Sequence, residues 1–321
     1  MAKIHDHDHE ELNSAHQIPA DAPIAPNTEL DMTLSWSKVK PKYENTAQTL
    51  AKQVKLDGFR QGKVPAKIAL QYINPERLVE LTTQKVLETE YAPFIEKSGK
   101  QPVGRPEINI VEAEEGKDWK IKVVLAERPL IDLTNIEKLL KQIKKDRAAD
   151  AKQRSMEEEK ADKQEKDTLD ESMRKQQDER KATQEKERLL GFTYANLIKA
   201  LNPRVPELLV KQEAEEQLHN LSHQLNHFKL TFADYISQRG VSEKDFMQEV
   251  TTSALSRLQL AFLANDLMAH FKTTPSAQEV SDALAKETKD AQEYYQKNPD
   301  SQATYAQKLA QERLEELLLA D

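Results

Sequence analysis

The sequence predicts an α+β domain, a long charged helical linker and an all-helical domain, in that order. Three observations support this prediction. Apolar residues alternate with polar ones in short runs before residue 126. No Gly or Pro occurs between Pro129 and Gly191, and beyond Gly191 apolar residues recur at helical spacing. We therefore expect a small antiparallel sheet with helices, then the linker, then an all-α C-terminal domain.

Composition narrows the class of protein. The chain has 321 residues, a net charge of −8 and no cysteine. Disulfides, thiolate metal sites and a Cys nucleophile are therefore excluded, and the chain as a whole is not built to bind nucleic acid. No apolar run is long enough to span a bilayer, and the N-terminus lacks the apolar core of a signal peptide. We expect a soluble cytoplasmic protein with no membrane partner.

Residues 1–27 are predicted to be a disordered, His-rich tail. Three prolines punctuate this polar segment, which cannot bury enough apolar surface to fold. His5, His7 and His9 alternate with aspartates, but an unfolded tail has no second shell to orient metal ligands. We assign no metal site there.

Residues 28–135 are predicted to form the α+β domain. The alternating residues of its first strand are Leu30, Met32, Leu34 and Trp36. Pro41 then suits the first turn of a helix that runs to about Val54, and Pro65 starts a short helix through Tyr72.

The second half of this domain carries stronger local signals. Asn74 followed by Pro75 is a typical helix start, and Gly99 is a typical helix end. Two strands joined by the turn 114–117 follow as a hairpin. Their alternating apolar residues are Ile108, Ile110 and Ala113 on one strand, and Trp119, Ile121, Val123 and Leu125 on the other.

Residues 136–190 are predicted to be a charged helical linker. More than half of them are charged, and opposite charges recur four residues apart, as at Glu159 and Lys163. Each such pair adds only about 0.2–0.5 kcal/mol, but many together stabilise a solvated helix. A continuous helix of this length would be a rod on the order of 80 Å long. Sustained heptads are missing, and a disordered charged linker is the alternative.

Residues 191–321 are predicted to be all-helical. One helix follows Pro206, a short one ends at Gly240, and Ser242 opens a longer one that ends before Pro275. Two further helices, separated at Asn298 and Pro299, complete the chain.

Three histidines lie on one face of the helix after Pro206. His219, His223 and His227 are spaced four residues apart, which is compatible with metal chelation. We interpret them as a polar helix face and predict no metal and no other cofactor.

The segment 58–65 is the main candidate for a binding site. Gly58 and Gly62 permit positive φ on either side of Phe59 and Arg60, and Pro65 directs the chain into a helix. An exposed Phe beside an Arg indicates a contact surface. The alternative is a tight turn with a buried Phe.

Local charge supports a polyanionic partner for this segment. Residues 36–72 contain eight basic and two acidic residues, within an acidic protein. The basic residues are Lys38, Lys40, Lys42, Lys52, Lys55, Arg60, Lys63 and Lys67, and the acidic ones are Glu44 and Asp57.

The run Asp57-Gly58-Phe59-Arg60-Gln61-Gly62-Lys63-Val64-Pro65 closely resembles the ribosome-docking signature of the trigger factor family, G-F-R-x-G-K-x-P. Weaker similarity extends to residues 102–106, 205–210 and 295–298, so the resemblance covers roughly 28–135 and 191–321. The predicted ribosome-binding residues are Gly58, Phe59, Arg60, Gln61, Gly62, Lys63 and Pro65, supported by the basic residues Lys52, Lys55 and Lys67.

The resemblance implies an ATP-independent chaperone. Its partners would be the protein and rRNA of the large ribosomal subunit near the exit tunnel, together with nascent or unfolded polypeptides. The family commonly has Lys where this chain has Gln61, which implies weaker docking or a different ribosome. The sequence leaves client range and weak self-association open.

We predict no enzyme activity and no catalytic residue. Trigger factors usually carry a prolyl isomerase domain of the FKBP type, which needs an aromatic-lined pocket, yet residues 137–190 contain no aromatic residue. The chain also lacks a phosphate-binding loop, a nucleophile elbow and an H-E-x-x-H motif. The alternatives are an active prolyl isomerase, a holdase that does not use the ribosome, and a purely structural spacer.

Overall fold

The computed structural model describes residues 22–57, 59, 64–161 and 171–320. These form two compact units. The sheet unit contains Ile24–Arg128 and Pro206–Glu216. The helical unit contains Pro129–Val205 and the residues from Gln217 onward.

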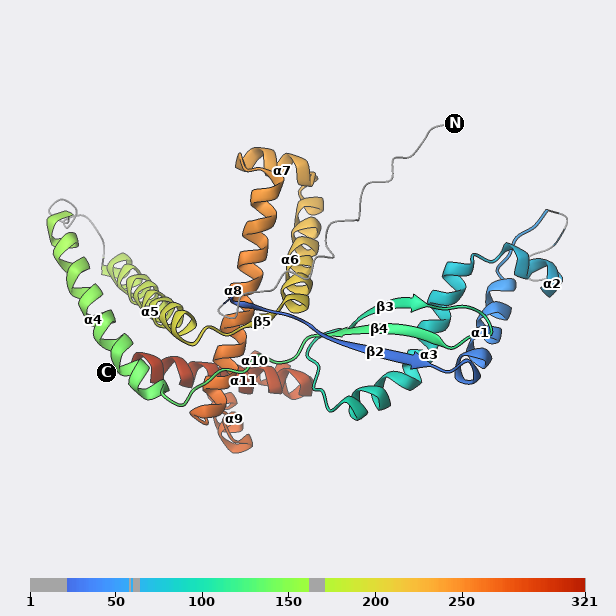
Figure 1. Cartoon of the computed structure of the whole chain (residues 1–321). Helices are drawn as coiled ribbons and strands as arrows, with labels where there is room; N and C mark the ends of the chain where they lie inside the picture. The colour runs from blue at the N-terminus through green and yellow to red at the C-terminus, as the bar shows by residue number, and fades with distance from the viewer. Residues whose placement is uncertain (1–21, 58, 60–63, 162–170, 321) are drawn as a thin grey trace. The chain divides into compact units, whose positions relative to one another are not determined.

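A three-stranded antiparallel sheet is the centre of the sheet unit. Strand β4 (Trp119–Leu125) lies between β2 (Thr28–Leu34) and β3 (Glu107–Glu112), as Figure 1 shows. Ile121 is the register partner of Met32 on one side and of Ile110 on the other. A short strand, β1 (Ile24–Ala25), precedes β2, so defined structure begins before residue 28. The predicted hairpin is confirmed.

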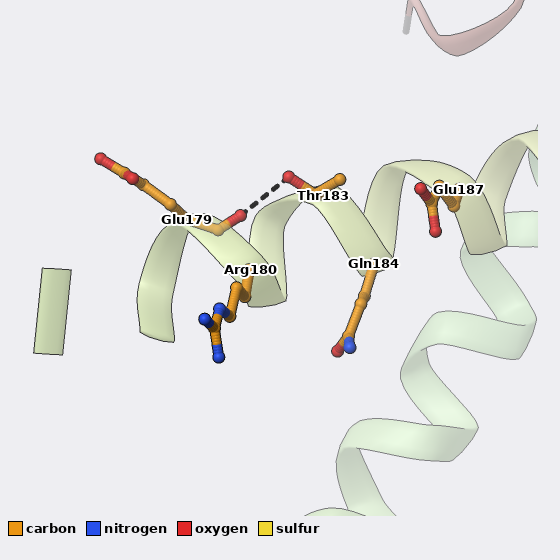
Figure 2. Close-up of a pocket in the computed structure, with 5 residues that line it drawn as sticks. All are labelled: Glu179, Arg180, Thr183, Gln184 and Glu187. Atoms are coloured by element: carbon orange, nitrogen blue, oxygen red, sulfur yellow. Dashed lines mark hydrogen bonds between the residues drawn. The ribbon is translucent and has the colours of Figure 1, made fainter. Parts of the chain in front are cut away.

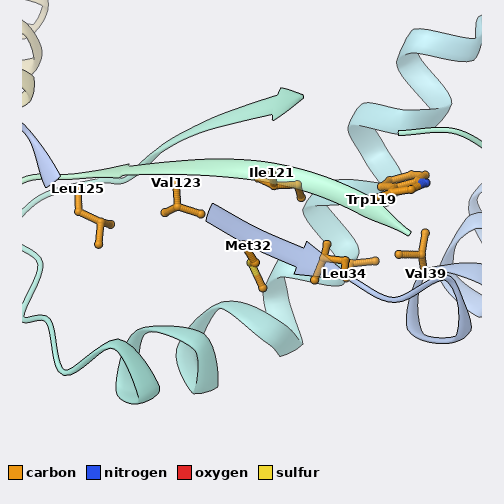
Figure 3. Packing of buried hydrophobic residues seen from close by; sticks show 8 residues of the cluster. Met32, Leu34, Val39, Trp119, Ile121, Val123 and Leu125 are labelled. Carbon is orange, nitrogen blue, oxygen red and sulfur yellow. The ribbon is translucent and has the colours of Figure 1, made fainter. Parts of the chain in front are cut away.

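Helices α1 (Trp36–Ala51) and α3 (Pro75–Ser98) complete the core of the sheet unit. Its buried residues come from the outer strand β2, the central strand β4 and the two helices, and Figure 3 shows most of them. They are Met32, Leu34, Val39, Val86, Trp119, Ile121, Val123 and Leu125. The Asn74 side chain caps α3, and Gly99 ends it with φ of 66°, as predicted. Between α1 and α3 lie α2 (Ala66–Ala69) and a 3₁₀ turn, η1 (Leu70–Tyr72).

The start of α1 differs from the prediction. Trp36 was expected in the first strand but is the first residue of the helix, and Pro41 lies inside the helix rather than in its first turn. The Trp36 N–H donates to the carboxylate of Asp118 at 2.7 Å. This partner satisfies one of the unpaired N–H groups of the helix start and comes from 82 residues along the chain.

The helical unit contains α4 and α5 and most of the later helices. Their bounds are α4 (Ile136–Ala161), α5 (Glu171–Leu201), α6 (Glu207–His227), α7 (Phe232–Arg239), α8 (Glu243–His270), α9 (Ala277–Leu284), α10 (Lys289–Lys297) and α11 (Pro299–Leu319). The first turns of α6 belong to the sheet unit, and a short strand, β5 (Val205–Pro206), precedes them. Three helices follow Pro275, not two, because Thr288 caps an additional helix start.

The charged segment forms two helices that lie side by side rather than a single rod. Asp150 of α4 accepts from the guanidinium of Arg188 of α5 at 2.8 Å, and residues 162–170 between the helices lie outside the described residues. The N-terminal part of α4 and the C-terminal part of α5 belong to the core of the helical unit. Its buried members are Ile136, Leu140, Ile143, Leu197, Leu263, Leu267, Leu314 and Leu318.

Arg147 of α4 holds the end of the last helix. It is only 8% exposed. Its guanidinium donates to the Leu318 carbonyl at 3.2 Å and to the Leu319 carbonyl at 3.1 Å. The contact places a positive charge at the negative end of the α11 dipole. With α4 and α5 packed in this way, the predicted fold class is confirmed: an α+β part with a small antiparallel sheet, a charged helical segment and an all-α C-terminal part.

Candidate functional site

The candidate site lies between α1 and α2 in the sheet unit. Five of the predicted docking residues lie outside the described residues: Gly58, Arg60, Gln61, Gly62 and Lys63. Phe59 and Pro65 are described, as are the chain segments on both sides. The geometry of the site therefore comes from these flanks.

Phe59 is not a core residue. Its side chain is 43% exposed, although its N–H donates to the Leu56 carbonyl at 3.1 Å. The segment before it leaves α1 through two tight backbone hydrogen bonds, from Gln53 to Leu50 and from Val54 to Ala51. Phe59 thus has one backbone contact to the chain before it, while its side chain remains accessible.

Pro65 starts the short helix on the other side, as predicted. Its carbonyl accepts from the N–H groups of Ile68 and Ala69 at 2.9 and 3.0 Å. Ala69 is fully buried and anchors the segment, whereas Ile68 is 39% and Tyr72 is 61% exposed. Ile68 and Tyr72 are spaced like one face of a helix, and this face is turned toward solvent.

Sequence reasoning missed Ile68 and Tyr72. Their spacing of four residues is the same signal that a core-facing stripe gives. The position of this apolar pair close to Phe59 in the sequence was a possible signal of a binding surface. The pattern does not show whether the pair is packed against the rest of the protein or faces solvent. Phe59, Ile68 and Tyr72 are exposed apolar side chains on either side of residues 60–63 in the chain, and we call these three residues the loop surface.

The basic charge near the loop surface is unevenly neutralised. Lys38 and Lys40, at the start of α1, pair with Glu90 at 2.6 Å and with Glu44 at 3.9 Å. Lys52 and Lys55, at the end of α1, are exposed and form no ion pair within the described part of the chain. Lys67 lies in α2, where its side chain is outside the described residues. Lys42, within α1, likewise forms no ion pair in the described part of the chain, so unpaired positive charge extends from the middle of α1 to its loop end.

Comparison with known proteins identifies the family. Residues 24–164 match the model for the bacterial trigger factor protein, and residues 165–320 match the model for its C-terminus. The chain belongs to the trigger factor family. The trigger factor of Mycobacterium bovis (strain BCG / Tokyo 172) is 31% identical over 110 residues, which are 34% of this chain and 24% of that protein. The trigger factor of Corynebacterium jeikeium (strain K411) is 32% identical over 109 residues, which are 34% of this chain and 21% of that protein.

A solved structure has a similar fold over most of the chain. It belongs to a study of promiscuous substrate recognition in the folding and assembly activities of the Trigger Factor chaperone. The match has a TM-score of 0.53, covers 92% of this chain and 97% of that chain, and has 13% identity. The sequence matches to curated trigger factors span about a quarter or less of their length, 24% and 21% for the two relatives above.

No catalytic constellation is found in the described residues of this trigger factor family member. They contain no group of three or more metal-ligating side chains, and none of their helices is long and apolar enough to cross a membrane. Burial, with a contribution from Glu315, raises the pKa of Tyr194 to about 12, which keeps its hydroxyl neutral. Such a group suits packing rather than proton transfer at neutral pH.

A surface hollow on α5 also lacks functional side chains that point toward a common centre. Figure 2 shows that its lining comes from a single helix, with the side chains spread along the helix. The lining residues are Glu179, Arg180, Thr183, Gln184 and Glu187. The Thr183 hydroxyl donates back to the Glu179 carbonyl at 2.9 Å, so it is occupied within the helix. A ligand site would require groups from more than one element.

Proposed function

We propose that this chain is an ATP-independent chaperone that docks on the large ribosomal subunit through residues 58–65 and holds nascent or unfolded polypeptides. The observation that carries the proposal is the half-exposed Phe59, whose N–H donates to the Leu56 carbonyl, in a member of the trigger factor family. In this proposal residues 28–135 bind the ribosome and residues 191–321 bind clients.

Docking would combine apolar and electrostatic contacts. The loop surface supplies three exposed apolar side chains, Phe59, Ile68 and Tyr72. Aromatic residues with an adjacent Arg are the usual anchors of protein interfaces, and Arg60 follows Phe59 directly. The unpaired Lys52 and Lys55 support attraction to rRNA phosphates, which weakens as salt rises.

Client binding would use exposed apolar side chains of the helical unit. Within residues 191–321, those with the largest exposure are Phe228 at 70%, Tyr294 at 56% and Met247 at 39%. They are separate side chains rather than one deep pocket, which favours weak binding to many sequences. The flexible side chain of Met247 suits contacts that repack against varied partners. The solved chaperone with the same fold is described as recognising its substrates promiscuously, which supports this assignment.

The proposal excludes prolyl isomerase activity. The two family matches meet between residues 164 and 165, so no part of this chain lies between them. Residues 137–190 contain no aromatic residue from which an isomerase pocket could be built. A peptidyl-prolyl isomerisation assay tests this directly, and catalysis above the uncatalysed rate would contradict the proposal.

Ribosome co-sedimentation tests the docking assignment. Because anchor residues contribute about 2 kcal/mol or more, Phe59→Ala should weaken ribosome binding by roughly 30-fold. Phe228→Ala is the matched control, since it also removes an exposed Phe but from the helical unit. We expect Phe228→Ala to pellet with ribosomes as the wild type does. Equal pelleting of Phe59→Ala, Arg60→Ala and wild type at low and moderate salt would refute docking through this loop.

A holdase that does not use the ribosome is the second candidate. It is distinguished by combining the co-sedimentation result with an aggregation assay on a chemically unfolded client. Suppression of aggregation without ribosome binding would establish the second candidate. Loss of both activities would exclude chaperone function altogether.

A further inference from the structure

Two histidines on α6 converge in a way that their spacing alone does not require. The Nε2 atoms of His219 and His223 lie 3.1 Å apart, with ring centroids 4.5 Å apart and ring planes at 82°. Both side chains are exposed. His227 continues the same spacing, but its ring lies against Phe228 with centroids 5.5 Å apart. The three histidines have the same spacing in the sequence, but in the structure only the rings of His219 and His223 contact each other.

The separation of the two nitrogens fits joint coordination of one metal ion. Imidazole nitrogens bind Zn²⁺ at about 2.0–2.1 Å. Two such ligands lie about 2.9 Å apart at a right angle and about 3.3 Å apart at a tetrahedral angle, by simple trigonometry on that bond length. The observed 3.1 Å falls between these values. We propose that His219 and His223 form a two-histidine site for a divalent transition-metal ion, with Zn²⁺, Ni²⁺ and Cu²⁺ as its ligand class.

A hydrogen bond between the two neutral rings would give the same distance. That bond would be exposed to water, where it contributes little to stability. The hydrogen bond and the metal site use the same approach of the two Nε2 atoms, so the metal would replace a shared proton without a rearrangement of the helix. The helix therefore already holds the two nitrogens at a chelating separation, and only the two rings would have to turn for a metal to bind.

The ligands of the site limit its affinity for a metal ion and determine which ions it prefers. No third His, Cys, Asp or Glu completes a metal-binding group among the described residues, so water would fill the remaining positions. Neither Nδ1 atom has a hydrogen-bond partner in that part of the chain, and such partners normally strengthen histidine ligands. We therefore expect binding far weaker than at a four-ligand structural zinc site. Affinity should rise from Co²⁺ to Ni²⁺ to Cu²⁺ and fall again at Zn²⁺.

Metal binding would tighten the second half of α6. Residues four apart are neighbours on a helix, so a bridging ion binds the helix more tightly than it binds the unfolded chain. Tighter binding to the folded state stabilises that state as metal concentration rises. The expected effect is slower amide exchange around residues 219–227 when metal is present.

Isothermal titration with NiCl₂ and ZnCl₂ tests the proposal on the full chain. His5, His7, His9 and His16 are replaced by Ala in all samples, because they offer competing ligands. In this background we expect about one metal ion per chain. His219→Ala and His223→Ala should each weaken binding more than about tenfold, since even the loss of second-shell partners costs 10–100-fold. His227→Ala is the matched control and should bind as the background does.

Three outcomes would overturn the proposal. These are no binding in the background protein, unchanged binding in His219→Ala, or equal losses in all three single variants. The far-UV circular dichroism of each variant without metal should match the background, which shows that the helix has not been lost. None of these results depends on ribosome binding or client binding.

Discussion

Removal of the Arg147 guanidinium should destabilise the helical unit by a measurable amount. In Arg147→Met the apolar stem is kept while both hydrogen bonds to the α11 carbonyls are lost. Hydrogen bonds to a charged group contribute about 1.5–3 kcal/mol each, and a charge at a helix end adds about 0.3–1 kcal/mol. Because the two bonds share one group and water can reach the helix end, we expect a total loss of about 2–4 kcal/mol. Arg147→Lys should retain only part of this stabilisation, since a single ammonium cannot make both hydrogen bonds in the geometry of the guanidinium group.

Urea unfolding measures this loss with an internal reference. Both tryptophans of the chain, Trp36 and Trp119, lie in the sheet unit, so their fluorescence follows that unit. Far-UV circular dichroism is dominated by the helices. With an m-value of about 2–3 kcal/mol/M, the dichroism midpoint should fall by about 0.7–2 M in Arg147→Met, while the fluorescence midpoint stays unchanged.

Arg154→Met is the control on the same helix. Its guanidinium contacts Asp150 at 3.2 Å, but the Arg154 side chain is 53% exposed. An exposed pair of this kind contributes about 0.2–1 kcal/mol. If Arg147→Met changes the dichroism midpoint no more than Arg154→Met does, the guanidinium does not hold the end of α11 and the reasoning is wrong.

Two further predictions concern a glycine and a carboxylate. Gly104→Ala and Gly116→Ala both place Ala at a positive φ, 77° and 86°, and the backbone strain costs about 1–2 kcal/mol in each variant. Only at Gly104 would the new Cβ also meet another atom, since Leu209 Cδ2 would lie 2.8 Å from it. In thermal unfolding Gly104→Ala should therefore be the more destabilised by about 1 kcal/mol, and equal losses would show that the contact relaxes freely. The pKa of Glu279 is lowered from its ordinary value near 4.5 to about 2, chiefly by a backbone N–H at the start of α9 and then by Arg313. A lowered pKa stabilises the fold above pH 4.5, and this contribution is lost as pH falls toward 2. The melting temperature of wild type should thus exceed that of Glu279→Gln at pH 7, and this difference should shrink between pH 4.5 and 2. A difference that stays constant over this pH range would contradict the stabilising role of the ionised Glu279.

Much of the fold follows from local signals. Asn74 accepts two backbone N–H groups at the start of α3, and Gly99 ends that helix in the left-handed region. Thr231 caps α7 by the same chemistry. These contacts join residues within a few positions of one another, so the residue types at those positions are sufficient to predict them.

The candidate site was predictable in part. Phe59 was expected to be exposed, and it is 43% exposed. Ile68 and Tyr72 were not identified, because an apolar pair four residues apart has the same pattern whether it faces a core or water. Exposure is decided by what the rest of the chain places against that face, and a short segment does not contain this information.

The sequence by itself determined the order of the α+β part, the charged segment and the all-α part, both ends of α3, the local excess of basic charge and the resemblance to the trigger factor family. Only the tertiary structure decided which residues meet across large separations along the chain. Asp118 receives the first N–H of α1, which moved Trp36 out of the strand. Arg188 meets Asp150 where α5 packs beside α4, so the charged segment forms two packed helices instead of one rod. Helical propensity and capping depend on neighbouring residues, whereas these pairings depend on side chains brought together by packing of the whole unit.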